Sequence, residues 1–551
     1  MIGVVADPAD HDIAREFFEL FKTPWEFYST GRQYEVLLCL GGEAADTHGK
    51  LTIFYAGRTI QFDERLGIEP DRPSLGGILS YQQHRLPIYC DLIIFAKEEH
   101  ALLTEESSNR CAAFLKQTSH GAVARIGYDL FAEIRSLLTA GQPAANALLP
   151  ALELHISVLR DVITCCGISV PEIPPVPEGH DFIVCLTHDV DHPAVRQHKW
   201  DHTSFGFLFR AVVGSLERFV RRRLPARDVL RNWAAVLKLP LVHLRLVNDF
   251  WYEFADRYLQ LENGRPSTFF VIPFKDQPGT SHSGSPSKLR AVRYGARDIA
   301  DNIQKLSNAG CEIGLHGIDA WHDSSRGRLE LDEIRSLTGA PETGVRMHWL
   351  YYGEHSAANL EKAGAAYDST IGFNNAVGYR AGTTQVYRPL GASQLLELPL
   401  HVMDTALFYR AYLDLSSAEA EARLRKMEDN VGYFGGILTV NWHDRSLAPE
   451  RLWGGAYRNL IDRLESRGAW FATAGQAVAW FRKRRAATFE IESPTGKVRA
   501  RVAVDHARNL PALRLRVHEP RGSGPGGASS AAPGIHADFA VEETDRATVT
   551  A

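Results

Sequence analysis

Apolar strands that end in polar residues alternate with amphipathic helices through the middle of this 551-residue chain. The predicted strands are FIVCL, TFFVI, CEIGL, GVRMHWL, AAYDSTIGF, LLELPLHVMD, GGILTV and AWFATAG. Helical segments such as RDIADNIQKLSNAG separate most of them. This alternation predicts a parallel sheet, because each helix returns the chain to the same end of the sheet. Seven or eight such units suggest closure into a barrel, so we expect an α/β barrel over residues 181–485.

The rest of the chain is predicted to form smaller parts. Residues 1–150 alternate short strands with helical patterns, as in a smaller α/β domain of unknown role, and we interpret LLTEESSNRCAAFLKQ within them as a helix. A helix and the proline-rich PEIPPVPEG form a linker over residues 151–180. Residues 486–520 alternate polar and apolar side chains around a PTG turn, which predicts a small β module. Residues 521–551 begin with RGSGPGGASSAAPG and are predicted to be a disordered tail.

Composition excludes several classes of protein. The net charge of -5 argues against a nucleic-acid-binding surface, and 45% hydrophobic residues exclude a wholly disordered chain. The seven cysteines are scattered and form no CxxC pair, which indicates reduced thiols. The N-terminal segment has no basic start or apolar core of a signal peptide, and no apolar run reaches about 18 residues. We therefore expect a cytoplasmic protein.

Polar motifs follow three of the predicted barrel strands. LTHDVDH contains Asp189 and Asp191, which a straight strand would place on one face. GLHGIDAWHD contains His316 and His322, and LTVNWHD contains His443. Each motif alone is typical of a polar strand end.

Together the three motifs predict a catalytic metal centre. One Asp and two His are ligand types that leave open positions on Zn²⁺ for water and substrate. A second carboxylate and a third histidine then remain for general acid and base chemistry. Since the carboxyl ends of barrel strands meet at one face, we expect all of these residues to lie close together.

These motifs, with GVRMHW and YDSTIGF and in this order, resemble the NodB-type polysaccharide deacetylases. The resemblance covers about residues 180–485 and is nearest to the bacterial subgroup that begins with THDVD. It implies a distorted (β/α)7–8 barrel that removes an acetyl group from an N-acetylated sugar. It also implies one divalent transition metal, with Zn²⁺ as the first expectation.

The resemblance implies catalytic or supporting roles for four residues. Asp189 matches the general base, and Arg346 matches the arginine that orients and tunes it. His443 matches the general acid, and Asp368 matches a carboxylate that supports the active site. A carboxylate should keep His443 protonated, and the candidates are Asp368, Asp404 and Asp444.

The resemblance also implies three metal ligands, Asp191, His316 and His322. The two histidines are six residues apart instead of the family's four, which is about 240° on an ideal helix. The segment must therefore be an irregular loop, or another residue must be the third ligand. The substitutes are Asp319, Asp323 and His348.

A long insertion, about residues 192–266, interrupts the predicted barrel after its first strand. Its basic residues Arg218, Arg221, Arg222 and Arg223 alternate with Leu216, Phe219 and Val220. Such a face is typical of a solvated helix or a lid over the site. The alternative is a peripheral contact with anionic lipid at the inner face of a membrane.

The sequence therefore favours a metal-dependent deacetylase that acts on an N-acetylated sugar in cell-surface polysaccharide biosynthesis. One alternative is an amidase for a cyclic or small amide. Another is a non-catalytic carbohydrate-binding protein. The expected partners are a carbohydrate or a lipid-linked sugar, and no nucleic acid. The oligomeric state stays open.

Overall fold

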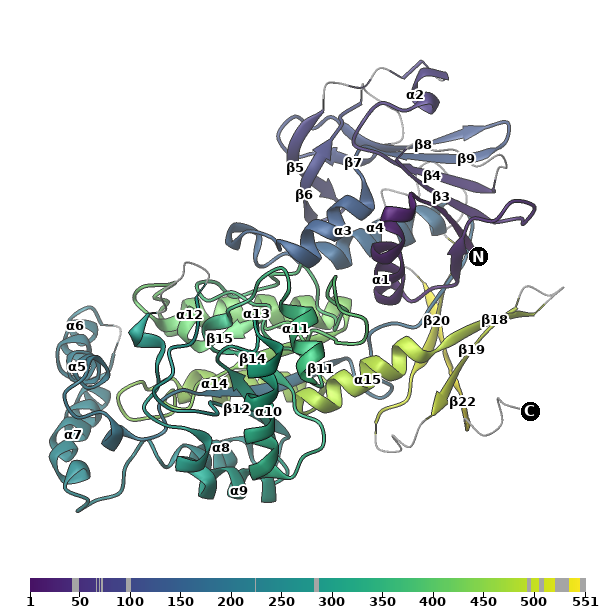
Figure 1. Cartoon of the computed structure of the whole chain (residues 1–551). Helices are drawn as coiled ribbons and strands as arrows, with labels where there is room; N and C mark the ends of the chain where they lie inside the picture. Colours follow the sequence, from purple (N-terminus) through teal and green to yellow (C-terminus); the bar gives the residue numbers. More distant parts are fainter. Residues whose placement is uncertain are drawn as a thin grey trace. The chain divides into compact units, whose positions relative to one another are not determined.

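The computed structural model (Figure 1) folds into two compact units. Unit 1 comprises Met1–Gly179, Tyr379–Leu390 and Trp480–Ala551, and unit 2 comprises His180–Gly378 and Gly391–Ala479. The residues that the structure describes are 1–41, 49–65, 67–68, 70, 73–95, 101–222, 224–281, 287–492, 497–504, 510–520 and 535–545.

The strands of unit 2 form one parallel sheet. They are β11 (Phe182–Val190), β12 (Ser267–Val271), β13 (Glu312–Gly317), β14 (Val345–Met347), β15 (Val402–Met403), β16 (Ile437–Asn441) and β17 (Ala469–Phe471). The order is β14-β13-β12-β11-β16-β15, and β17 pairs with the start of β11. All nine residues of β11 are buried, as expected for a parallel strand covered on both faces.

The sheet closes on itself through two single-residue bridges. Asp368 bridges to Val345 of β14 on one side and to Glu397 on the other. The segment that contains Glu397 continues into β15, which pairs with β16. Unit 2 is therefore the predicted distorted (β/α) barrel, in which single bridges hold part of the ring.

Helices cover the outside of the barrel. They are α8 (Phe254–Glu262), α9 (Ala300–Asn308), α10 (Ser324–Thr338), α11 (Ser356–Ala363), α13 (Ser417–Phe434) and α14 (Gly454–Ser466). Neighbours contact one another in the order α11, α10, α9, α8, α14, α13, so they surround the strands as a continuous arc. The short α12 (Asp404–Phe408) follows β15, and α15 (Ala474–Ala486) follows β17.

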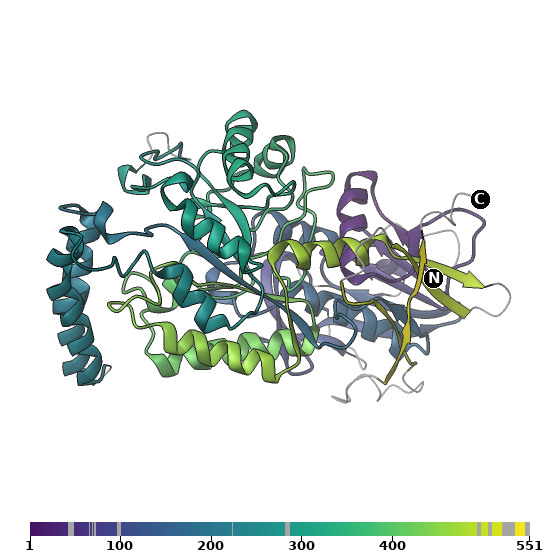
Figure 2. The same ribbon diagram turned by 90° about the horizontal axis from the view of Figure 1, so that it is seen from below.

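The insertion lies between β11 and β12 and is helical. It contains α5 (His202–Leu208), the π-helical stretch η4 (Phe209–Gly214), α6 (Ser215–Val220) and α7 (Ala226–His243). Figures 1 and 2 show these helices together at one edge of unit 2, away from the barrel strands. A small core that includes Phe207, Ala235 and Trp251 anchors them. Within the described residues, every helix is too short or too polar to cross a bilayer.

Unit 1 contains a nine-stranded mixed sheet in the order β2-β1-β3-β4-β9-β8-β7-β5-β6. Its strands are β1 (Ile2–Val5), β2 (Trp25–Phe27), β3 (Val36–Leu40), β4 (Leu51–Tyr55), β5 (Ser74–Tyr81), β6 (His84–Leu92), β7 (Ala101–Glu105), β8 (Cys111–Thr118) and β9 (Gly121–Ile126). Its helices are α1 (His11–Phe21), α2 (Gln61–Arg65), α3 (Leu130–Thr139) and α4 (Ala151–Cys165). The predicted helix LLTEESSNRCAAFLKQ is wrong, because this segment forms β7, a turn at Asn109 with positive φ, and β8. Pairing with β5 and β9 outweighs its weak helical periodicity.

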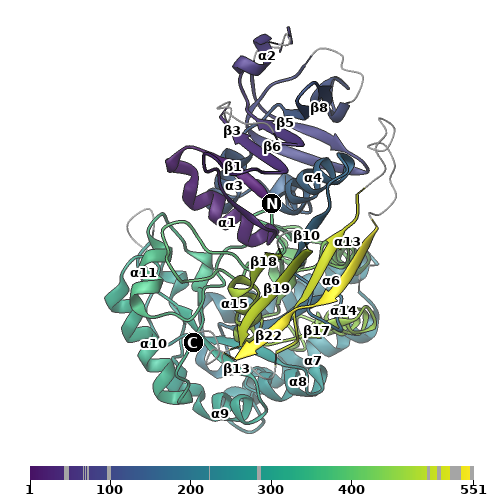
Figure 3. The ribbon, with the colours of Figure 1, turned by 90° about the vertical axis from the view of Figure 1, so that its right-hand side faces the viewer.

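Two small sheets complete unit 1. β18 (Thr488–Glu492), β19 (Lys497–Val504) and β22 (Glu542–Asp545) lie side by side in Figure 3. The predicted PTG turn between β18 and β19 lies outside the described residues. The other sheet joins β10 (Val170–Glu172), β20 (Arg514–His518) and β21 (His536–Ala540). The predicted disordered tail is therefore wrong for residues 536–545, whose backbone groups pair with strands from distant parts of the chain.

Candidate active site

A cavity of about 380 Å³ lies where the barrel strands end. Asp189 and Asp191 enter it from the end of β11, His316 from β13, His348 from just beyond β14, and His443 from just beyond β16. Parallel strands carry their carboxyl ends to one face of a barrel, so residues distant in sequence meet there.

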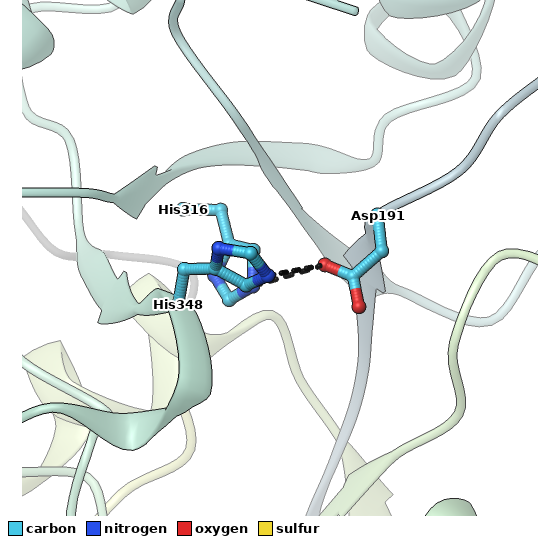
Figure 4. A group of neighbouring side chains, drawn as sticks. All are labelled: Asp191, His316 and His348. Atoms are coloured by element: carbon cyan, nitrogen blue, oxygen red, sulfur yellow. Dashed lines mark ion pairs between the residues drawn. The ribbon is translucent and has the colours of Figure 1, made fainter. Parts of the chain in front are cut away.

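Asp191, His316 and His348 form a group that could hold a metal ion (Figure 4). The Oδ1 atom of Asp191 lies 3.4 Å from His316 Nε2 and 3.5 Å from His348 Nε2. In a tetrahedral zinc site with bonds of about 2.0–2.1 Å to nitrogen and oxygen, ligand atoms lie about 3.3–3.4 Å apart. The two separations from Asp191 are therefore close to the edge length of such a tetrahedron.

The protonation of these side chains also fits a cation. Asp191 Oδ1 is buried and has no hydrogen-bond partner, which is unfavourable unless a cation binds there. His316 Nδ1 donates a hydrogen bond of 2.9 Å to the carbonyl oxygen of Arg346, so its Nε2 lone pair faces the site. Burial lowers the pKa of His348 to about 3, which leaves this imidazole neutral and able to bind metal. The three residues could thus hold a metal ion.

His322, the predicted third ligand, does not join this group. Its Nε2 lies 3.1 Å from Oδ1 of Asp319, on the loop after β13. The neighbouring strand supplies the second histidine instead, because His316 pairs in register with Arg346 and His348 lies two residues further.

The other two substitutes are engaged elsewhere. Asp319 accepts a hydrogen bond of 2.7 Å from the backbone of Thr280 and forms an ion pair with Arg326. Asp323 caps the N-terminus of α10. The signal that could have favoured His348 was its place in GVRMHW, two residues after the predicted Arg346.

Asp189, the predicted general base, is buried and tightly held. Its Oδ1 accepts a hydrogen bond of 3.0 Å from Arg346 Nη1, and its Oδ2 accepts one of 2.8 Å from Asn441 Nδ2. Burial raises the pKa of Asp189, but Arg346 and His316 lower it more, so the pKa lies below its usual value. The carboxylate is therefore ionised at neutral pH. Sequence reasoning missed Asn441, which precedes the predicted His443 by two residues.

Arg346 is fully buried and makes hydrogen bonds with each of its guanidinium nitrogens. Besides Asp189, it donates to Thr187 Oγ1 at 2.8 Å, to the Ser369 carbonyl at 3.0 Å and to Ser369 Oγ at 2.8 Å. These contacts fix the plane of the guanidinium and hence the orientation of the Asp189 carboxylate.

Asp368 lies behind Arg346 and is not among the described residues that line the cavity. Its Oδ1 accepts a hydrogen bond of 2.5 Å from Thr370, and it neighbours Glu397. Burial raises the pKa of Asp368 to about 6. Asp368 bridges to Val345, the residue before Arg346, so its predicted role as a carboxylate that supports the active site stays a prediction.

His443 is held by Asp404, one of the three carboxylates that the sequence offered as candidates. Its Nδ1 lies 2.6 Å from Asp404 Oδ1, and its backbone N–H donates to Asp404 Oδ2 at 2.8 Å. Burial lowers the pKa of His443, but Asp404 and Asp191 raise it more, to about 10. The imidazole is therefore protonated at neutral pH. Its Nε2 faces the cavity, 3.8 Å from Asp191 Oδ2.

Aromatic side chains border the cavity. Trp349 and Tyr412 line it and are 39% and 41% exposed. Trp349 and Leu350 both have positive φ, 65° and 53°, a conformation that is costly for bulky residues and is often found at functional sites. Trp442, by contrast, is fully buried and packs inside unit 2.

Comparisons with known proteins give structural matches only. No family model and no curated protein sequence matches this chain. A probable polysaccharide deacetylase from Pseudomonas aeruginosa PAO1 is 15% identical, with 56% of this chain and 94% of that chain covered and a TM-score of 0.36. The carbohydrate deacetylase Agd3 is 8% identical, with 98% of each chain covered and a TM-score of 0.35. Puue allantoinase is 15% identical, with 56% and 93% covered and a TM-score of 0.35. The functional argument therefore rests on the side chains described above.

Proposed function

We propose that unit 2 is a metal-dependent deacetylase that hydrolyses the acetamido group of a sugar in cell-surface polysaccharide biosynthesis. The observation that carries this proposal is the position of the Asp191, His316 and His348 group. It lies between an ionised carboxylate, Asp189, and a protonated imidazole, His443. Amide hydrolysis is accelerated by a base that takes a proton from the attacking water and an acid that protonates the leaving nitrogen.

The side chains divide the proton transfers between them. When bound, a divalent cation would polarise the acetyl carbonyl and acidify water. Asp189 accepts the proton of the water molecule whose oxygen adds to the acetyl carbon. His443 then donates its Nε2 proton to the amine nitrogen as the C–N bond breaks, which releases acetate and the free amino sugar. Arg346 and Asp404 hold these two groups in place and in the charge states that the reaction needs.

A sugar suits the cavity better than a small cyclic amide. The exposed ring of Trp349, held in an unfavourable backbone conformation, offers a flat apolar face at the cavity wall. Sugar rings pack on such faces, whereas a small amide would leave it exposed.

Acetate release from N-acetylated sugars by the metal-loaded protein tests the proposal. The variant Asp189→Asn keeps the size and hydrogen bonding of the side chain but cannot accept a proton. It should bind metal normally and lose about two to four orders of magnitude in turnover. Wild-type turnover in this variant would exclude Asp189 as the base, and absence of acetate release by the wild type would refute the function.

The substrate is proposed to be linked to lipid, with the insertion resting on a membrane surface. Fourteen of the 22 exposed large hydrophobic side chains in the described part of the chain lie in residues 200–246. They are Trp200, Phe205, Phe209, Val212, Val213, Leu216, Phe219, Val220, Leu230, Trp233, Leu237, Leu241, Leu244 and Leu246. The same 47 residues contain nine basic and three acidic residues, in a chain whose net charge is -5. Exposed apolar and basic side chains on the same helices suit an anionic bilayer.

Co-sedimentation with vesicles tests this contact. The protein should bind anionic vesicles at low salt and dissociate as salt rises, since each basic residue adds about 1 kcal/mol. A variant with four arginines replaced by Glu should lose vesicle binding and keep hydrolysis of a soluble substrate. The four are Arg218, Arg221, Arg222 and Arg223, the last of which lies outside the described residues. Failure of the wild type to bind, or self-association through this face, would overturn the membrane contact.

A further inference from the structure

Three arginines line the same cavity as the candidate metal centre. Arg210 comes from the π-helical stretch η4 of the insertion, and Arg445 and Arg451 follow His443 on the loop after β16. Among the described residues, none of the three guanidinium groups has a carboxylate oxygen within 4.0 Å. Charged groups in a partly buried cavity are usually paired, so this unbalanced set of cations is unusual.

The contacts of the arginines orient them without neutralising them. Arg451 donates a hydrogen bond of 2.7 Å to the hydroxyl of Tyr409 and lies 4.8 Å from the ring centre of Trp453. Arg445 lies 4.9 Å from the ring centre of Trp251. The Nε atoms of Arg210 and Arg451 are buried and have no hydrogen-bond partner. Arg451 as a whole is only 5% exposed. Such donors are costly unless a ligand accepts from them.

The Glu450 carboxylate interacts electrostatically with all three arginines, but burial still raises its pKa above the usual value, and one carboxylate cannot balance three guanidinium groups. The acidic residues that line the cavity are engaged with other groups. Asp189 is paired with Arg346, and Asp191 faces the two metal-site histidines. The three arginines also repel one another, which is visible in the pKa of Arg210. Burial, and then Arg451 and Arg445, lower the pKa of Arg210 to about 9.

We propose that Arg210, Arg445 and Arg451 bind a phosphoryl group of the substrate, which makes the substrate a phosphorylated N-acetylated sugar. This inference rests on the proposed deacetylase function. Guanidinium groups match phosphate oxygens with paired, charge-assisted hydrogen bonds. A phosphoryl group offers more oxygens and more charge to three arginines than a carboxylate does. The phosphoryl group could belong to a nucleoside diphosphate or to a polyprenyl diphosphate, because both present the same chemistry next to the sugar.

Binding of inorganic pyrophosphate, measured by calorimetry, tests the subsite without reference to activity. Arg210→Met and Arg451→Met should each weaken binding about ten- to a hundred-fold, and both are checked for folding by circular dichroism. Arg297→Met is the matched control, since Arg297 is exposed and pairs with Glu333. The variant His348→Ala should keep pyrophosphate binding. If pyrophosphate binding is lost in His348→Ala and kept in both arginine variants, the anion binds at the metal centre, and the proposed arginine subsite is wrong.

Hydrolysis rates then define the substrate. The wild type should prefer an N-acetylhexosamine 1-phosphate over the unphosphorylated sugar by about a hundred-fold in kcat/KM, and Arg210→Met should remove most of this preference. Comparison of nucleoside-diphosphate and polyprenyl-diphosphate sugars separates the two sources. Equal kcat/KM values for the phosphorylated and neutral sugars would overturn the inference. Hydrolysis of neither would refute the deacetylase function, while the pyrophosphate result would still decide the subsite.

Discussion

Replacement of His348 by Ala tests the assignment of the third metal ligand. The structure places His348 Nε2 3.5 Å from Asp191 Oδ1, whereas His322 is bound to Asp319. His348→Ala should therefore lose one of three protein ligands, and His322→Ala should lose none. The two variants remove the same side chain at positions 26 residues apart, so each is the control for the other.

The expected loss follows from the number of ligands. A four-ligand zinc site binds with about 10–16 kcal/mol, or about 2.5–4 kcal/mol per ligand. Loss of one ligand should therefore weaken binding by about two to three orders of magnitude. His348 is 4% exposed, so its replacement also leaves a cavity that costs some stability, independent of metal.

Competition with a chromophoric chelator measures zinc affinity, and elemental analysis after dialysis measures zinc content. We expect His348→Ala to retain little zinc and His322→Ala to retain about one ion per chain. Thermal unfolding of both variants in the presence of chelator measures the stability lost to the cavity alone, because neither protein then contains zinc. Normal zinc affinity in His348→Ala, together with loss in His322→Ala, would refute the reasoning and restore the sequence-based ligand set.

Three further predictions concern charge. Asp404→Asn should move the basic limb of the pH–rate profile about one to three pH units lower, because loss of the adjacent anion lowers the pKa of His443. A basic limb that does not move would exclude the pairing of His443 with Asp404. Arg346→Met should lower the free energy of unfolding by about 3–5 kcal/mol in urea titrations, and adding Asp189→Asn should restore part of it; purely additive losses would contradict the buried pair. In unit 1, burial raises the pKa of Glu172, but its ion pair with an arginine and its contact with a histidine lower it to about 2. This depressed pKa stabilises the fold above about pH 4.5 and the effect is lost as pH falls toward 2, so the difference in unfolding free energy between wild type and Glu172→Gln should shrink from about 3 kcal/mol at pH 7 toward zero.

The sequence by itself determined the barrel and much of the candidate site. Alternating apolar strands and amphipathic helices allow few arrangements other than a parallel sheet, and such a sheet gathers its strand ends at one face. Asp189, Asp191, His316 and His443 could therefore be placed together from their positions after predicted strands. This reasoning needs only the order of residues within each strand.

Only the tertiary structure decided which residues from different elements touch. His348 faces Asp191 because β14 lies beside β13, and Asp404 reaches His443 because β15 lies beside β16. Spacing along the chain carries no information on such neighbours, so it favoured His322. The strands β7, β8, β21 and β22 were missed for the same reason, since their backbone groups are satisfied by partners from other segments. Residues gathered from separate segments, such as Arg210 and Arg451, have no pattern in the sequence, because only folding brings the insertion and the loop after β16 to one cavity.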